Sequence, residues 1–72
     1  MFQTRFNQKA VGYEIRFRSL FRDGQAMAFP CDADGHVDID ALSEHARQNY
    51  LFARAMVGRE YAMPEVQVDA LH

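Results

Sequence analysis

The sequence contains a single cysteine, Cys31, so no disulfide can form within the chain. No apolar run approaches the roughly 20 residues that a membrane-spanning helix needs, and the N-terminal residues lack the apolar core of a secretory signal peptide. No phosphate-binding glycine loop, activated nucleophile or pair of acid–base carboxylates is recognisable. These absences favour a cytoplasmic protein that does not contact the membrane, is not an enzyme and binds no cofactor.

The chain has 72 residues and a net charge of −2, which predicts one small domain over residues 1–72. A chain of this length buries only about 60% of its unfolded surface, so it often needs a metal or a partner for support. Charge is unevenly placed. Residues 1–22 carry five basic side chains against Glu14, whereas residues 23–45 carry six acidic side chains and no lysine or arginine. Such polarity can guide a partner or a second copy of the chain.

The first 10 residues are mostly polar, and we interpret residues 1–10 as a flexible N-terminal arm. From Gly12 onward the pattern has a period of two, which is typical of a half-buried strand. Apolar side chains at Tyr13, Ile15, Phe17 and Phe21 alternate with charged side chains at Glu14, Arg16, Arg18 and Arg22.

The turn signal Asp23-Gly24 follows, and it predicts an antiparallel hairpin of strands at 12–21 and 25–31. A three-residue loop, 22–24, keeps the apolar face continuous and pairs Phe17 with Phe29. This loop also puts Gly24 where a left-handed backbone is needed. Because Pro30 cannot donate a ladder hydrogen bond, the second strand is expected at an edge.

Residues 40–58 contain no proline and carry an apolar stripe at helical spacing, which predicts one long amphipathic helix. Asp38 or Asp40 is the expected N-cap. Residues 65–68 alternate and are compatible with a short third strand, although a helix extension or a tail over 59–72 stays open. The expected fold class is therefore α+β, a β-hairpin followed by one helix.

Acidic residues gather in the segment CDADGHVDID, and Asp32, Asp34 and Asp38 resemble the acidic core of EF-hand calcium loops around Gly35. The resemblance is incomplete, because Pro30 falls at the first ligand position and the twelfth position lacks the usual glutamate. A turn that leads into the helix explains the same residues, and we prefer it to a calcium site.

Two surfaces are candidates for binding. Arg16, Arg18 and Arg22 form a basic face of the predicted hairpin that suits nucleic-acid phosphates, although the chain is acidic overall. Tyr50, Leu51 and Phe52 lie on or beyond the flank of the helix stripe and leave apolar surface that one hairpin cannot cover.

We therefore expect a non-catalytic interaction module that forms a homodimer or binds another protein through Tyr50, Leu51 and Phe52. The alternative is a nucleic-acid-binding accessory protein that uses Arg16, Arg18 and Arg22. A calcium-binding module is the third hypothesis.

Overall fold

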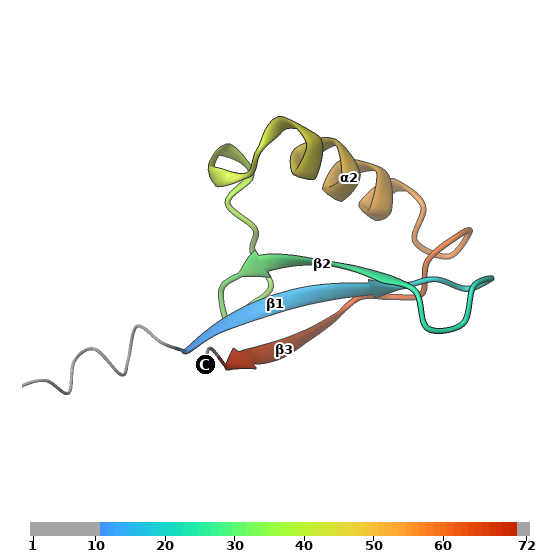
Figure 1. The fold of residues 1–72 in the computed structure, drawn as a ribbon, viewed down its shortest axis with the longest axis horizontal. Helices are drawn as coiled ribbons and strands as arrows, with labels where there is room; N and C mark the ends of the chain where they lie inside the picture. The colour runs from blue at the N-terminus through green and yellow to red at the C-terminus, as the bar shows by residue number, and fades with distance from the viewer. Residues whose placement is uncertain (1–10, 71–72) are drawn as a thin grey trace, which may run out of the picture.

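The computed structural model describes residues 11–70, so the predicted arm at 1–10 lies outside the described residues. Within this range the chain has the predicted α+β fold. Figure 1 shows the helix lying across one side of a sheet, with β3 as the strand farthest from it. The elements are β1 (Val11–Arg18), β2 (Ala26–Cys31), a short 3-10 helix η1 (Ile39–Ala41), the α-helix α2 (Glu44–Ala55) and β3 (Glu65–Ala70).

The described strands form one antiparallel sheet in the order β2-β1-β3. Ile15 and Phe17 of β1 are buried on the face that α2 covers, called here the helix-side face. Arg16 and Arg18 alternate with them on the opposite, outer face and are exposed. β2 is an edge strand, as expected for a strand that contains Pro30. The short third strand is also confirmed.

The register of the hairpin differs from the prediction by two residues. Phe29 pairs with Ile15 and not with Phe17, so the predicted three-residue loop over 22–24 is wrong. The apolar face nevertheless stays continuous, because a shift of two residues preserves the alternation of side chains. Gly24 adopts the predicted left-handed conformation, with a φ of 80°.

Ser19 provides the physical reason for the wider loop. Its Oγ accepts hydrogen bonds from the backbone N–H groups of Phe21, at 3.2 Å, and Arg22, at 3.0 Å. The N–H of Leu20 donates instead to the carbonyl of Glu60, at 2.9 Å. The chain therefore leaves the β-ladder after Ser19, earlier than alternation alone predicts.

α2 is shorter at both ends than the predicted helix. Ser43 is its N-cap, and the Ser43 Oγ accepts a hydrogen bond from the N–H of Ala46 at 3.1 Å. Asp38 precedes η1 without a side-chain capping bond, and Asp40 lies within η1. The predicted N-caps, Asp38 and Asp40, are therefore wrong, because a separate 3-10 turn occupies this segment. Within residues 11–70 no helix combines the length and apolar character needed to cross a bilayer.

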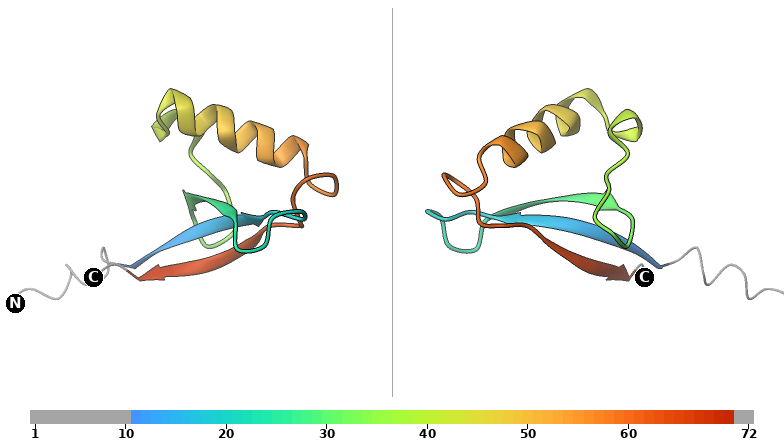
Figure 2. Two further views of the ribbon diagram at one scale, coloured as in Figure 1. Left: turned by 45° about the vertical axis from the view of Figure 1, so that its right-hand side comes forward. Right: turned by 180° about the vertical axis from the view of Figure 1, so that it is seen from behind.

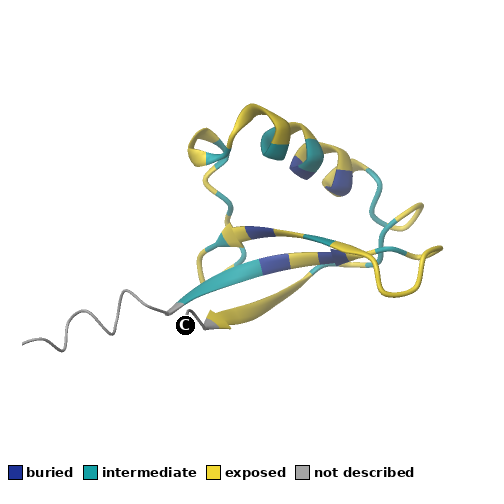
Figure 3. Cartoon of the chain, in the orientation of Figure 1, coloured by how far each residue is buried: buried dark blue, intermediate teal, exposed yellow. Residues whose placement is uncertain are grey.

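The core lies between α2 and the strands β1 and β2. Figure 3 shows its buried segments on the facing sides of the helix and of these two strands. Three aromatic rings meet edge-to-face, with centroid distances of 6.0 Å for Phe17–Phe29, 6.2 Å for Phe17–Tyr50 and 5.3 Å for Phe29–Tyr50. Such pairs contribute about 0.5–1.5 kcal/mol beyond the burial of their area. Ile15 and Ala53 complete the buried set.

Candidate interaction surface

Large apolar side chains remain exposed at three places on the described molecule. One place is the hairpin loop, the second is α2, and the third is β3 with the segment before it. Phe21, predicted on the apolar face of the first strand, belongs to the loop and is 74% exposed. The exposed residues are Leu20, Phe21, Leu51, Phe52, Met63, Val66 and Val68.

On α2, two of the three predicted interaction residues are exposed. Leu51 and Phe52 keep nearly half of their surface accessible, and the Phe52 ring packs edge-to-face on Tyr61 at a centroid distance of 6.2 Å. The prediction that Tyr50 belongs to the interaction surface is wrong, because Tyr50 is buried against β1 and β2. The guanidinium carbon of Arg54 lies 5.5 Å from the centroid of the Tyr50 ring. Tyr50 is therefore a core residue.

The β3 surface was missed by sequence reasoning. Val66 pairs with Ile15 and Val68 with Tyr13, so both valines lie on the helix-side face. They are nevertheless 41% and 61% exposed, because the buried residues of α2 contact β1 and β2. Their alternation along 65–68 was visible in the sequence. The position of the helix, which leaves them uncovered, was not.

The segment between β2 and α2 covers part of this face. Figure 2 shows it passing over the sheet before it rises to the helix. Gly35 has a φ of 88°, and a Cβ atom at this position would lie 3.2 Å from Val66 Cγ2. The left-handed backbone therefore favours glycine here, and a Cβ atom would also crowd the Val66 side chain of β3.

The acidic loop in this segment is organised by its own backbone. Asp32 Oδ1 accepts hydrogen bonds from the N–H groups of Asp34, at 2.9 Å, and His36, at 2.8 Å. Its other oxygen lies 3.3 Å from His36 Nδ1. These bonds, chiefly the one from the His36 N–H, hold the pKa of Asp32 below its usual value.

The predicted calcium set of Asp32, Asp34 and Asp38 is not the cluster that the fold assembles. In the described residues, the side chains whose ligand atoms lie within 4.8 Å of one another are Asp32, Asp34 and His36. All three are exposed. These three side chains are the ones that could hold a metal ion, but Asp32 already serves the loop as a hydrogen-bond acceptor.

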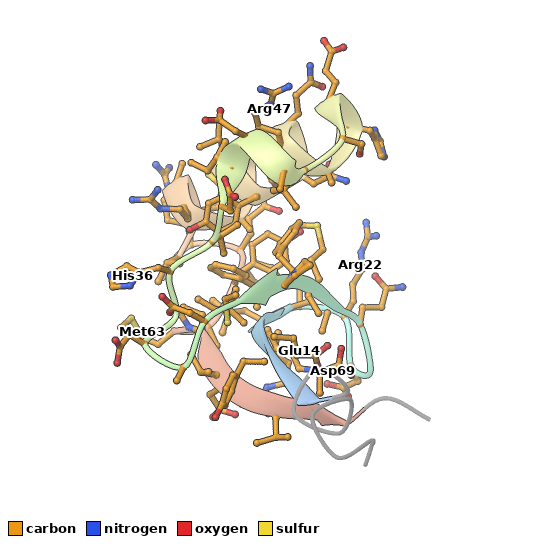
Figure 4. The ribbon with its side chains drawn as sticks, turned by 90° about the vertical axis from the view of Figure 1, so that its left-hand side faces the viewer. Glu14, Arg22, His36, Arg47, Met63 and Asp69 are labelled. Atoms are coloured by element: carbon orange, nitrogen blue, oxygen red, sulfur yellow. The ribbon has the colours of Figure 1, made fainter. Side chains whose placement is uncertain are left out.

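The predicted basic face is divided. Arg16 and Arg18 share the outer face of the sheet, but Arg22 belongs to the hairpin loop and stands apart from Glu14 in Figure 4. Arg16 Nη2 lies 3.4 Å from Glu14 Oε2, and Arg16 is paired with Glu65 across the β1–β3 ladder. Negative charge is therefore mixed into this face, which weakens its attraction for phosphates.

The Cys31 thiol is the remaining reactive group of interest. Partial burial raises its pKa, and the negative charges of Asp32 and Glu14 raise it further. A thiol with a raised pKa is protonated at neutral pH, and the thiolate is the nucleophilic form. Cys31 packs against the core, which is consistent with a structural role.

Comparison with known proteins found no match to this chain among family models, curated proteins or solved structures.

Proposed function

We propose that this protein is a small, non-catalytic interaction module that associates with a second copy of itself. One observation supports the proposal. Of the described residues, five form the buried apolar core, whereas seven large apolar side chains remain exposed. Burying one large apolar side chain contributes about 1.5–3 kcal/mol of stability. A domain with so small a core needs this additional stabilisation.

The exposed side chains are placed to be buried by a neighbour. Leu51 and Phe52 lie on a regular helix, where an apolar side chain can enter a groove of a partner with little loss of backbone freedom. Opposite charges in two consecutive stretches of the sequence, five basic residues in 1–22 and six acidic residues in 23–45, suit contact between copies.

The solution mass of the full chain tests this proposal. We expect light scattering and sedimentation velocity to show a mass that rises with concentration between micromolar and millimolar. Leu51→Glu combined with Phe52→Ser should lower the association constant, because it places a charge where apolar contact is needed. Gln48→Glu combined with Ala55→Ser is the matched control, since it makes similar changes on the same helix without removing a large apolar side chain.

Two results would contradict the proposal. A wild-type monomer over the whole concentration range would exclude self-association. Equal association of the Leu51/Phe52 variant and its control, with both still folded by circular dichroism, would exclude α2 as the contact.

A further inference from the structure

The edge of β3 that faces away from β1 can accept another strand. β3 pairs with β1 along one edge, and within residues 11–70 no strand pairs with its other edge. A free edge presents backbone N–H and C=O groups, which proteins commonly protect with short strands, proline or charged side chains. β2, the opposite edge strand, contains Pro30. β3 has no proline, and its helix-side residues are Val66 and Val68.

The two faces of β3 define what kind of strand would fit. Val66 and Val68 expose apolar surface on the helix-side face. Glu65, Gln67 and Asp69 alternate with them and so lie on the outer face, where all three are exposed. A complementary strand therefore needs apolar side chains on one face and basic side chains on the other.

Residues 4–9 of the chain match this pattern in part, with Phe6 among the polar Thr4 and Gln8 on one face, and Arg5 and Lys9 on the other. Residues 1–10 read MFQTRFNQKA and lie outside the described residues. In this sequence the apolar Phe2 and Phe6 occupy even positions, whereas the basic Arg5 and Lys9 occupy odd positions. The spacing of four between Arg5 and Lys9 equals the spacing between Glu65 and Asp69.

We propose that residues 4–9 of one copy pair antiparallel with β3 of a second copy. In this register Arg5 lies opposite Asp69, Lys9 opposite Glu65, and Phe6 opposite Val68. Shifting the antiparallel register by two residues in either direction removes both charge pairs. The inference rests on the proposed self-association, because the added strand comes from another copy.

Chain length excludes the same antiparallel pairing within one copy. Val11 pairs with Ala70 at one end of β3, whereas Lys9 would have to lie beside Glu65 at the other end. Glu65 and Ala70 are five steps apart, or about 17 Å along a strand. The two residue steps from Lys9 to Val11 span about 7 Å at most, so Lys9 cannot reach Glu65 of its own copy in this pairing. Only a second copy can supply the strand in this register.

Charge reversal in the full chain tests the pairing. We expect Arg5→Asp to weaken self-association by about tenfold, because it places two negative charges opposite one another. We expect the same loss for Asp69→Arg, which places two positive charges opposite one another. The double variant, with both substitutions, should recover the wild-type association constant. Arg59→Asp is the matched control, because it makes the same change in net charge at an exposed residue outside the sheet. Hydrogen exchange at Val66 and Val68 should slow as association increases.

The other outcomes overturn this inference, either alone or together with the proposed function. Association that neither single reversal changes, or that the double variant does not recover, overturns the strand pairing but leaves self-association intact. A wild-type monomer overturns both. A monomer in which the two valine amides are protected only in the presence of Arg5 and Asp69 shows that the arm occupies its own β3 in a different pairing, which also overturns the pairing between copies.

Discussion

Asp32 shows how a residue that resembles a metal ligand can serve the backbone instead. Its carboxylate accepts two N–H groups of the loop that follows β2, and the N–H of Asp32 donates to the carbonyl of His36 at 3.0 Å. Gly35 closes the same turn by donating its N–H to the Asp32 carbonyl at 3.0 Å. The turn positions Gly35 against β3, so Asp32 indirectly determines how the loop covers the sheet.

The charge of Asp32 should make stability depend on pH in the acid range. The pKa of Asp32 in the folded chain lies below the ordinary value of 3.8, mainly because the N–H of His36 donates to the carboxylate. The ionised form therefore stabilises the folded state above that ordinary value, and the contribution disappears as the pH falls through the folded-state pKa. Asp32→Asn removes this titration while keeping an oxygen acceptor.

Urea unfolding on both sides of pH 3.8 measures the effect. We expect wild type to be more stable than Asp32→Asn at neutral pH, with the difference shrinking as the carboxylate is protonated. Asp34→Asn, a neighbour in the same turn, is the control and should show a smaller change. A difference between wild type and Asp32→Asn that stays constant with pH would contradict this role.

At the scale of the elements, the start of α2 depends on Ser43. Free N–H groups in the first turn of a helix need an acceptor, and Ser43 Oγ supplies one for Ala46. Asp38 and Asp40 are also good capping residues, but η1 removes them from the helix. The helix therefore begins where a serine follows the 3-10 turn.

Removing this cap should weaken the fold. Ser43→Ala is expected to lower the free energy of unfolding by about 0.5–2 kcal/mol. Asp38→Ala and Asp40→Ala, made separately, should each cost less than Ser43→Ala. Thermal and urea unfolding followed by circular dichroism measure all three variants. A larger loss from Asp38→Ala or Asp40→Ala than from Ser43→Ala would mean that the helix begins earlier in solution.

At the scale of the whole molecule, stability depends on a few aromatic contacts. Phe17 and Phe21 stand four residues apart, and alternation places both on one apolar face. The fold separates them, because Phe17 is 1% exposed in the core and Phe21 is 74% exposed in the hairpin loop. This pair allows the same substitution to be made in two opposite environments.

Phe17→Ala should cost about 3–5 kcal/mol, which is comparable with the whole stability of so small a core. We therefore expect this variant to be largely unfolded, and Phe17→Leu to remain folded with a smaller loss. Phe21→Ala should change the free energy of unfolding of the monomer by less than about 0.5 kcal/mol. Urea unfolding at low concentration checks these values. Similar losses for Phe17→Ala and Phe21→Ala would show that the hairpin loop packs into the core.

The sequence predicted the fold class because its signals are local. Alternation from Tyr13 to Phe17 indicates a half-buried strand, and the proline-free stripe around Ala53 indicates a helix. The same local rules failed at Ser19 and Ser43, where a side-chain hydroxyl competes for backbone N–H groups. They also placed Tyr50 on the surface, although the gap between α2 and the sheet accommodates an aromatic ring.

The sequence by itself determined the order of strands and helix, the apolar face of the first strand, and the turn of the chain at Gly24. These properties follow from periodicity and from backbone sterics, which act over a few residues. Only the tertiary structure decided that α2 lies over β1 and β2, which buries Tyr50 and leaves Val66 and Val68 exposed. A periodic pattern indicates that the apolar face of a strand or helix is to be covered, but packing between distant segments decides which neighbour covers that face.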